Sequence, residues 1–350
     1  MGKVCSFRKG YGIAKDDLSS DGTPCILYGE LYTTYKTAIA KTIKSKTSIQ
    51  SKSLVYSQKD DVIIPCSGET AEDIATSICV PYDGVLLGGD LTIVHSDLDG
   101  AFLSNQINSV RKYDIARIAQ GKSIVHLQAD ELKKIFIFCP TIQEQRKISA
   151  FIDKIDERIE IQNKIISKYE TLIKGLCDMI FRHNKSVSLS DLVKCKTSAL
   201  QENTVSTCHR GEYKVLGASG AIAAIDTYQF EESGILVLKD GSKAGKIQFA
   251  QGKYSVVGTS VVLIPNEACD ARYLYFAMSS IDFEKYKVGS GIPHIYFKDY
   301  SNERIYYPEK ALRKKIIKTL DFYETRVEIE REMLSAMQKQ KAFLLQSMFI

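Results

Sequence analysis

The 350-residue chain lacks the features that would assign it to a membrane or to an export route. No apolar run reaches the roughly 18 residues that a membrane-spanning helix needs. The opening MGKVCSFRKG has basic residues but no apolar segment behind them. These absences predict a soluble, cytoplasmic chain without a targeting signal.

Metal and redox motifs are also missing. The nine cysteines form an odd set without a CxxC pair, and the five histidines show no metal-ligand spacing. We therefore expect reduced thiols, no metal and no cofactor. With 44% hydrophobic and 25% charged residues the composition is that of a soluble folded protein, and the net charge of +5 is compatible with nucleic acid.

Catalytic motifs are absent as well. Gly241-Ser-Lys-Ala-Gly-Lys246 is one residue shorter than a phosphate-binding P-loop, and Ile247 replaces the Ser or Thr that would bind magnesium. The sequence has no Asn-Pro-Pro-Tyr-like methyltransferase motif, no glycine-rich cofactor loop and no recognisable Ser-His-Asp set. No carboxylate cluster indicates a nuclease. We expect a chain that has no catalytic residues and is not an enzyme by itself.

What the sequence does contain is an internal repeat. Residues 121–181 match residues 289–349 without a gap when the chain is shifted by 168 positions. Among the matched pairs, Pro140 aligns with Pro308 and Asp153 with Asp321. Two copies of one plan predict a pseudo-two-fold arrangement, which suits a bipartite partner such as duplex DNA.

Each copy ends in a long helix with a heptad seam. The seam residues include Ile152, Ile159, Gln162 and Ile166 in the first helix, and Leu320, Val327, Glu330 and Leu334 in the second. Gln162 and Glu330 interrupt the two seams at matched positions. Because a polar seam residue can set the register, we expect the two helices to pair with each other. The alternative is that each helix packs only on its own globular segment.

The segments before the helices predict mixed α/β structure with short strands separated by glycine-bearing turns. The candidate strands are Cys25–Tyr28, Asp61–Pro65, Val85–Leu87, Leu91–Val94, Lys214–Leu216, Gly234–Leu238, Lys246–Phe249 and Val256–Ile264. The two segments align only loosely with each other.

Lysines and glycine turns in these segments are candidates for DNA contact. The stretch from Lys36 to Lys59 has no acidic residue, and its lysines suit phosphate contact. The second segment has a similar group around a glycine turn, and Pro65-Cys-Ser-Gly68 is the expected counterpart of that turn. The alternative is a solvated loop. The candidates are Lys36, Lys41, Lys44, Lys46, Ser67, Gly68, Lys239, Ser242, Lys243 and Lys246.

Three stretches together resemble the specificity subunit of type I restriction-modification enzymes. They are Gly10-Tyr-Gly-Ile-Ala-Lys-Asp-Asp17, Gly22-Thr-Pro-Cys-Ile-Leu-Tyr-Gly-Glu-Leu-Tyr32 and Cys139-Pro-Thr-Ile-Gln-Glu-Gln-Arg-Lys-Ile148. The resemblance covers essentially the whole chain. It implies two target-recognition domains that each read half of a bipartite double-stranded DNA site. It also implies two long helices paired antiparallel as a spacer, and docking of two methyltransferase subunits and, through them, a restriction or translocase subunit.

The resemblance also implies roles for particular residues. Tyr11, together with Lys122, Ser290 and His294, would lie near DNA, the last three in the matched loops Gly121–His126 and Gly289–His294. The alternative for the histidine is a hydrogen bond to a turn. Glu144 and Gln145 would serve methyltransferase docking. The second copy, Tyr307-Pro-Glu-Lys-Ala-Leu-Arg-Lys-Lys-Ile316, departs from the pattern because it lacks the Glu-Gln pair.

We therefore expect an α+β protein with two α/β target-recognition domains, at residues 1–140 and 185–307, joined by an antiparallel coiled coil. The two spacer helices would occupy residues 141–184 and 308–350. The spacer length would set the gap between half-sites, roughly one DNA turn or 34–36 Å. Two other functions stay open, an unpartnered DNA-binding protein and a structural adaptor whose helices serve protein assembly only.

Overall fold

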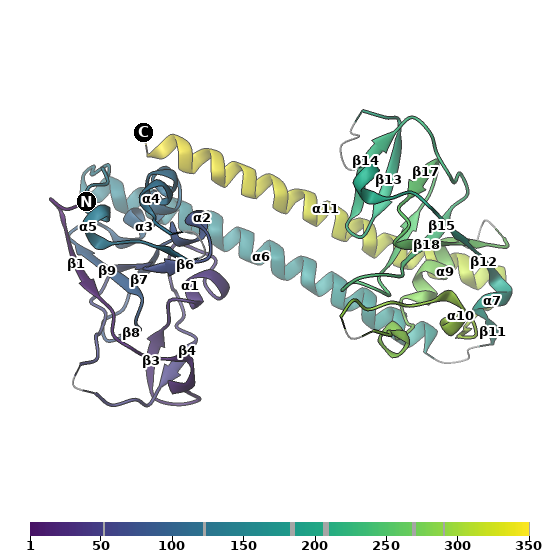
Figure 1. Ribbon diagram of the computed structural model, residues 1–350, viewed down its shortest axis with the longest axis horizontal. Coiled ribbons are helices and arrows are strands. Elements are labelled where there is room, and N and C mark those ends of the chain that lie inside the picture. Colours follow the sequence, from purple (N-terminus) through teal and green to yellow (C-terminus); the bar gives the residue numbers. More distant parts are fainter. Residues whose placement is uncertain are drawn as a thin grey trace. The chain divides into compact units, whose positions relative to one another are not determined.

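The computed structural model describes residues 1–51, 53–121, 124–182, 186–205, 210–267, 271–289 and 291–349. These residues form two compact units, most of whose elements are labelled in Figure 1. The first unit contains Met1–Asn163 and Glu332–Ile350, and the second contains Lys164–Arg331. Each unit therefore includes one globular domain and part of each of the two long helices, α6 (Ile142–Phe181) and α11 (Lys310–Met348).

In the described part of the first globular domain, short strands alternate with short α-helices and one 3-10 helix, Lys15–Asp17. Its strands are β1 (Cys5–Lys9), β2 (Leu18–Ser19), β3 (Thr23–Ile26), β4 (Ser45–Thr47), β5 (Asp61–Pro65), β6 (Ser67–Gly68), β7 (Ile78–Val80), β8 (Leu86–Leu87), β9 (Leu91–Ser96) and β10 (Val125–His126). Its helices are α1 (Glu30–Thr33), α2 (Ala71–Ile74), α3 (Gly100–Asn108), α4 (Lys112–Ile118) and α5 (Ala129–Leu132).

The second globular domain is built in the same manner. Its strands are β11 (Val187–Ser188), β12 (Val193–Thr197), β13 (Tyr213–Gly217), β14 (Gly220–Ile225), β15 (Gly234–Leu238), β16 (Ile247–Ala250), β17 (Tyr254–Val256), β18 (Ser260–Pro265) and β19 (Arg304–Ile305). Its helices are α7 (Leu189–Leu192), α8 (Glu202–Val205), α9 (Ala271–Met278) and α10 (Phe297–Tyr300).

The principal sheets of the two domains share one topology. The strand order is β1-β9-β5-β7 in the first domain and β12-β18-β15-β16 in the second, with every neighbouring pair antiparallel. In the other sheets, β3 pairs with β8 and β13 pairs with β17, both in parallel. The internal repeat therefore extends through the globular segments, where the two sequences align only loosely.

The burial of the two central strands, β5 and β15, explains why their sequences are mostly apolar. Every residue of β5 and of β15 is buried. In β5, Val62 and Ile64 belong to one core cluster while Ile63 belongs to another, because successive side chains point to opposite faces of a strand. The same alternation separates Leu236 from its neighbours in β15. A strand covered on both faces favours apolar residues, and the one charged residue of β5, Asp61, is buried with partners from β1 and β9.

Helix α6 begins at a capping box that follows Pro140. The Thr141 backbone N–H and hydroxyl donate to Glu144 Oε2 at 3.0 and 2.7 Å, and the Glu144 N–H donates back to Thr141 Oγ1 at 3.4 Å. This reciprocal arrangement satisfies backbone donors that the first helical turn would leave unpaired. The bonds to Thr141 hold the pKa of Glu144 below its ordinary value.

The two long helices pair in both units. In the first unit, Ile152 near the start of α6 shares a buried cluster with Phe349 beyond the end of α11. In the second unit, Tyr169 in the latter part of α6 lies against Tyr323 in the first half of α11, with ring centroids 6.4 Å apart. The start of each helix thus meets the end of the other, so the predicted antiparallel pairing of two long helices is confirmed.

The strand prediction was wrong in one place. A single strand was expected over Val256–Ile264, but two strands form there, because the backbone turns at Val257–Thr259 between β17 and β18. The prediction also missed β1, β7 and β12, which lie in the principal sheets. Among the described residues, no helix is both long and apolar enough to cross a membrane.

Candidate nucleic-acid interface

Two loops occupy the same structural position in the two domains. The backbone of Gln120 exchanges two hydrogen bonds with that of His126, at 3.0 and 2.7 Å. The backbone of Val288 does the same with that of His294, at 2.9 and 2.8 Å. Val288 lies 168 positions after Gln120, and His294 lies 168 positions after His126. The sequence repeat therefore preserves this loop closure.

A glycine makes each loop closure sterically feasible. Gly121 and Gly289 have positive φ values, 141° and 98°. A Cβ atom at Gly121 would lie 1.9 Å from the carbonyl oxygen of Ile124, and one at Gly289 would lie 2.8 Å from that of Ile292. Only glycine can hold both the conformation and the close approach of the backbone.

Each loop pairs with the turn that follows the central strand of its sheet. The Leu127 N–H donates to the Cys66 carbonyl and the Ile295 N–H donates to the Lys239 carbonyl, both at 2.9 Å. His126 lies opposite Ser67 in the β6–β10 ladder, and His294 forms a bridge with Asp240. The structure therefore aligns Ser67-Gly68 with Asp240-Gly241.

Both histidine rings contact these turns through Nδ1. The Ser67 hydroxyl lies 3.2 Å from Nδ1 of His126, and Asp240 Oδ1 lies 2.8 Å from Nδ1 of His294. His126 is exposed and the side chain of His294 is 39% exposed. Each histidine thus bonds a turn, while its ring still faces solvent.

In the first domain, Ser67 and His126 separate two surface grooves with volumes of about 770 and 960 Å³. Asp90 lines both grooves together with these two residues. Its φ of 58° is unusual for a residue other than glycine, and its carbonyl accepts from the Cys66 N–H at 2.7 Å. The sequence indicated a glycine turn before Asp90 but did not single out this carboxylate.

Tyrosines border the same region. Tyr11 is 49% exposed, and its N–H donates to the Leu87 carbonyl at 3.1 Å, next to the Gly88-Gly89 turn. The Tyr32 hydroxyl donates to the Ser67 carbonyl at 2.7 Å, and burial raises the pKa of Tyr32, so it remains a neutral donor. Tyr32 was not among the predicted site residues.

The lysines from Lys36 to Lys44 lie elsewhere. Lys36, Lys41 and Lys44 line a groove together with acidic residues of α6. The Lys41 ammonium is 2.6 Å from Asp153 Oδ1 and 3.0 Å from Glu157 Oε1. These carboxylates would repel a phosphate, so this position does not favour a phosphate contact by Lys41. Lys46 is exposed on β4.

The lysine and glycine turn of the second domain is not a nucleotide-binding loop. Gly241 and Gly245 both have positive φ, and strand β16, not a helix, follows the turn. Ser242, Lys243 and Lys246 are exposed and border a groove of about 510 Å³. Two further predicted residues, Lys122 and Ser290, lie outside the described residues.

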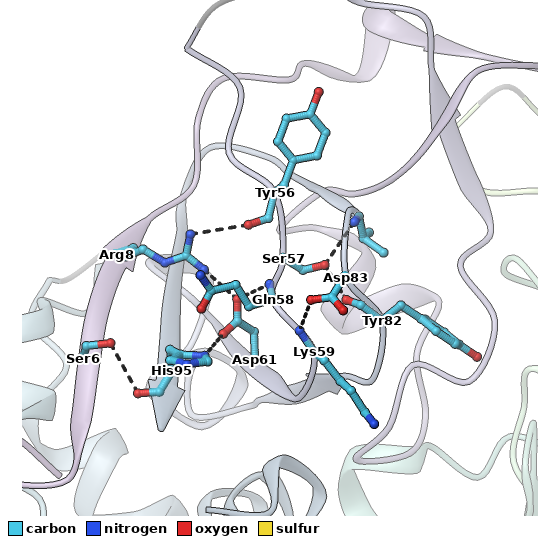
Figure 2. Close-up of polar contacts among 11 residues, drawn as sticks. Ser6, Arg8, Tyr56, Ser57, Gln58, Lys59, Asp61, Tyr82, Asp83 and His95 are labelled. Atoms are coloured by element: carbon cyan, nitrogen blue, oxygen red, sulfur yellow. Dashed lines mark hydrogen bonds and ion pairs between the residues drawn. The ribbon is translucent and has the colours of Figure 1, made fainter. Parts of the chain in front are cut away.

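A charged cluster holds three strands of the first domain together (Figure 2). Asp61 on β5 is fully buried and accepts from Arg8 Nη2 on β1 at 2.7 Å, and its Oδ1 lies 2.8 Å from Nδ1 of His95 on β9. The Gln58 N–H also donates to Asp61, at 2.8 Å. Because the carboxylate has several partners, its burial is compensated.

The predicted spacer residues lie mainly in the interior. Ile152, Gln162, Ile166, Leu320 and Val327 are buried, and Ile159, Glu330 and Leu334 are half-buried. Their position suits the helix pairing and leaves little surface for a partner.

Gln145 anchors α6 within the chain. It is 2% exposed, its amide donates to the Pro140 carbonyl at 2.8 Å, and its Oε1 accepts from the Asp99 N–H at 2.9 Å. In the second copy, Arg313 occupies the matched position and donates to the matched Pro308 carbonyl at 2.7 Å. The Glu-Gln pair of the motif therefore serves the helix start, through the cap at Glu144 and this anchor.

The duplicated α+β domains on paired helices define the class of protein, and comparisons with known proteins give the family. The family described as type I restriction modification DNA specificity domain matches residues 1–171 and again 182–338. The chain therefore belongs to the type I restriction-modification DNA specificity family. Among the described residues, no group of three His, Cys, Asp or Glu side chains could hold a metal ion.

Individual relatives agree with this assignment. The type I restriction enzyme MjaVIII specificity subunit of Methanocaldococcus jannaschii is 27% identical over 122 residues, which span 34% of this chain and 28% of that relative. The crystal structure of the S subunit of a type I restriction-modification system from M. genitalium matches with a TM-score of 0.65 and 15% identity, over 100% of this chain and 94% of that one. A structure concerned with complex assembly and conformational transition of the type I R-M system matches with a TM-score of 0.59 and 15% identity, over 99% and 96%. At such identities the structural matches establish the fold.

Proposed function

We propose that this chain is the non-catalytic specificity subunit of a type I restriction-modification complex. It reads a bipartite, asymmetric DNA target with one globular domain for each half. It docks two methyltransferase subunits and, through them, a restriction subunit. The observation that carries the proposal is the pair of matched histidine loops, each closed by a glycine and set on the same sheet topology.

In the first domain, the DNA-reading surface comprises the loop and turn around Ser67 and His126. Gly68 and Asp90 line this surface, Tyr11 is exposed beside the Gly88-Gly89 turn that precedes Asp90, and together they offer both hydrogen-bond donors and acceptors. A DNA-binding surface reads bases with such groups, while cations fix the phosphates. Lys9 lines the adjoining groove and supplies positive charge, whereas Lys133 in the same groove is paired with Asp130.

In the second domain, the corresponding surface comprises Asp240 and His294 with the lysines that flank them. Lys239, Lys243 and Lys246 lie on or beside the turn, and Ser242 is exposed on it. Lysine contacts to phosphate make affinity fall with salt by roughly 0.9 log unit per log unit of salt for each contact.

Methyltransferase docking uses the outer faces of the helices. In the first unit, Phe151 is 48% exposed and Phe343 is 68% exposed on these faces. In the second unit, Met179 and Phe322 are exposed in the same way. Large apolar side chains on an outer helix face are suited to contact with another protein.

The decisive experiment is methylome sequencing of the source cell with the gene intact and deleted. The expected result is the loss of modification at one motif made of two short half-sites around a fixed gap. A methylome that does not change would contradict the proposal.

A second experiment separates DNA reading from docking. Phe151→Asp should reduce co-purification of the methyltransferase subunit, while Ala150→Asp, at the exposed neighbouring position, should not. Both variants place the same charge on the same helix turn. Equal loss in both would show that the Phe151 side chain is not part of the docking surface. A chain that forms salt-insensitive complexes and has no affinity for DNA would support the structural adaptor instead.

A further inference from the structure

The two matched histidines differ in the group that faces Nδ1. Their loops have the same backbone closure and the same pairing with the turn after the central strand. On this common scaffold, the first domain presents the hydroxyl of Ser67 and the second presents the carboxylate of Asp240. The difference is therefore chemical and lies at one position.

A carboxylate and a hydroxyl impose different hydrogen positions on a neutral imidazole. An ionised carboxylate can only accept, so the hydrogen of the 2.8 Å contact belongs to Nδ1 of His294, and its Nε2 carries a lone pair. A hydroxyl can donate, so Nδ1 of His126 can be the acceptor of the 3.2 Å contact, and its Nε2 then carries the hydrogen. When the Ser67 hydroxyl donates, the far nitrogen Nε2 has the opposite character in the two domains.

We propose that the residue facing Nδ1, Ser67 in one domain and Asp240 in the other, is a specificity-determining position that sets which base edge the histidine reads. This inference rests on the proposed function and deepens it. An Nε2–H donor at His126 selects guanine O6 or thymine O4, because adenine and cytosine present an amino group at the corresponding position. An Nε2 acceptor at His294 selects an amino edge, adenine N6 or cytosine N4. The same scaffold would thus read different bases in the two half-sites.

The other groups around His294 do not decide which ring nitrogen carries the hydrogen, so Asp240 decides it. The nearest cation to Asp240 is the Lys239 ammonium, 4.0 Å from Oδ2, while Oδ1 contacts the ring. Backbone bonds hold His294 through Val288 and hold its neighbour Ile295, whose N–H donates to the Lys239 carbonyl. The backbone therefore fixes the place of the residue, and the side chain of Asp240 acts on the hydrogen position of the ring.

The first test needs no DNA. Nitrogen-15 NMR of the full chain labelled at histidine, at mildly alkaline pH, distinguishes the two neutral tautomers and the charged ring. We expect the hydrogen on Nδ1 in His294 and on Nε2 in His126. Asp240→Glu keeps a carboxylate that can only accept and should keep the hydrogen on Nδ1 of His294, whereas Asp240→Ser, whose hydroxyl can donate, should allow the other tautomer. The same tautomer in both wild-type histidines would overturn the proposal.

The second test reads the bases. The chain, purified with the subunits that accompany it in the source cell, selects binding sites from random DNA duplexes. Ser67→Asp should move the preference at one position of one half-site from guanine or thymine to adenine or cytosine, by roughly tenfold, about the value of one hydrogen bond. The other half-site should not change, and Ser67→Thr, which keeps the hydroxyl, should retain the original preference.

The outcomes separate this inference from the proposed function. If the wild-type complex selects a bipartite site but Ser67→Asp leaves the base preference unchanged, the histidine proposal is wrong and the specificity role stands. If the wild-type complex selects no site, the specificity role itself fails and the base-reading proposal fails with it. A change in both half-sites would also overturn the proposal, since it would indicate a general loss of structure.

Discussion

Lys341 is a cation on an otherwise mainly apolar helix seam, and its replacement gives a sharp test of the helix pairing. Its ammonium forms an ion pair with Asp156 of α6, and the side chains of the two residues are 20% and 9% exposed. The matched position in the first copy is Ile173. Lys341→Ile would therefore place the residue of the other copy on the seam, and it would leave Asp156 without its cation.

The loss of stability expected for Lys341→Ile follows from the burial of both Lys341 and Asp156. Removal of one partner from a fully buried ion pair costs about 3–5 kcal/mol, and the partial exposure of Lys341 lowers our expectation to about 2 kcal/mol. The double variant Asp156→Ala/Lys341→Ile removes the unpaired carboxylate as well. The stability of the double variant should lie within about 1 kcal/mol of that of the original chain, because apolar residues often replace a buried ion pair without loss of stability.

The pH dependence provides an independent check. Burial raises the pKa of Asp156 above its ordinary value of 3.8, and Lys341 opposes that rise. A raised pKa means that the folded state binds the proton more tightly than the unfolded state. Stability therefore falls as pH rises from the unfolded pKa through the folded pKa. The fall should be larger in Lys341→Ile, because the opposing cation is gone, and this contribution should be absent in the double variant.

The assay must be local, because a chain of two units does not have to unfold in one step. Hydrogen exchange of peptides from α6, followed by mass spectrometry, reports the free energy of local opening around Asp156. The single variant should exchange faster by roughly 30-fold, the equivalent of about 2 kcal/mol, and the double variant should regain most of the protection. If Lys341→Ile exchanges like the original chain, or if the double variant is less protected than the single one, the reasoning is refuted.

Three further predictions concern the domain core, the helix start and the spacer. Asp61→Asn removes the charge that pairs with Arg8 and His95, and should lower the stability of the first domain by about 2 kcal/mol, seen as an earlier thermal transition. An unchanged transition would show that the pair contributes nothing. Gln145→Leu leaves the Asp99 N–H and the Pro140 carbonyl without these bonds, and should increase proteolysis near the start of α6, whereas Gln143→Leu, at an exposed neighbour, should not. One heptad inserted into both α6 and α11 adds about 10 Å of helix, and should widen the tolerated gap between half-sites by about three base pairs in a binding selection. The same gap in the lengthened chain would contradict the spacer role.

Several elements could be predicted from local sequence because their signals are local. The heptad seams predicted both long helices, since a repeat of alternating threes and fours places the apolar residues along one helix face. The runs at β5 and β15 were predicted with correct bounds, because a strand covered on both faces reads as a nearly continuous apolar run, here interrupted only by Asp61 at the start of β5. The ungapped repeat also placed His126 and His294 in equivalent loops, which the structure bears out.

Other features depend on contacts between residues far apart in the chain. The strand order that the two principal sheets share could not be predicted from the sequence, because many different apolar sequences can form the same strand pairings. The lysines after Lys36 resembled a phosphate-binding run, but Lys41 pairs with acidic residues of α6 that are more than 100 positions away in sequence, and Lys36 and Lys44 line the same groove. The sequence by itself determined the repeat, the helices and the loop glycines, since these depend on periodicity and backbone geometry. Only the tertiary structure decided which charges are paired within the chain and which group faces each histidine, because side-chain partners are set by packing.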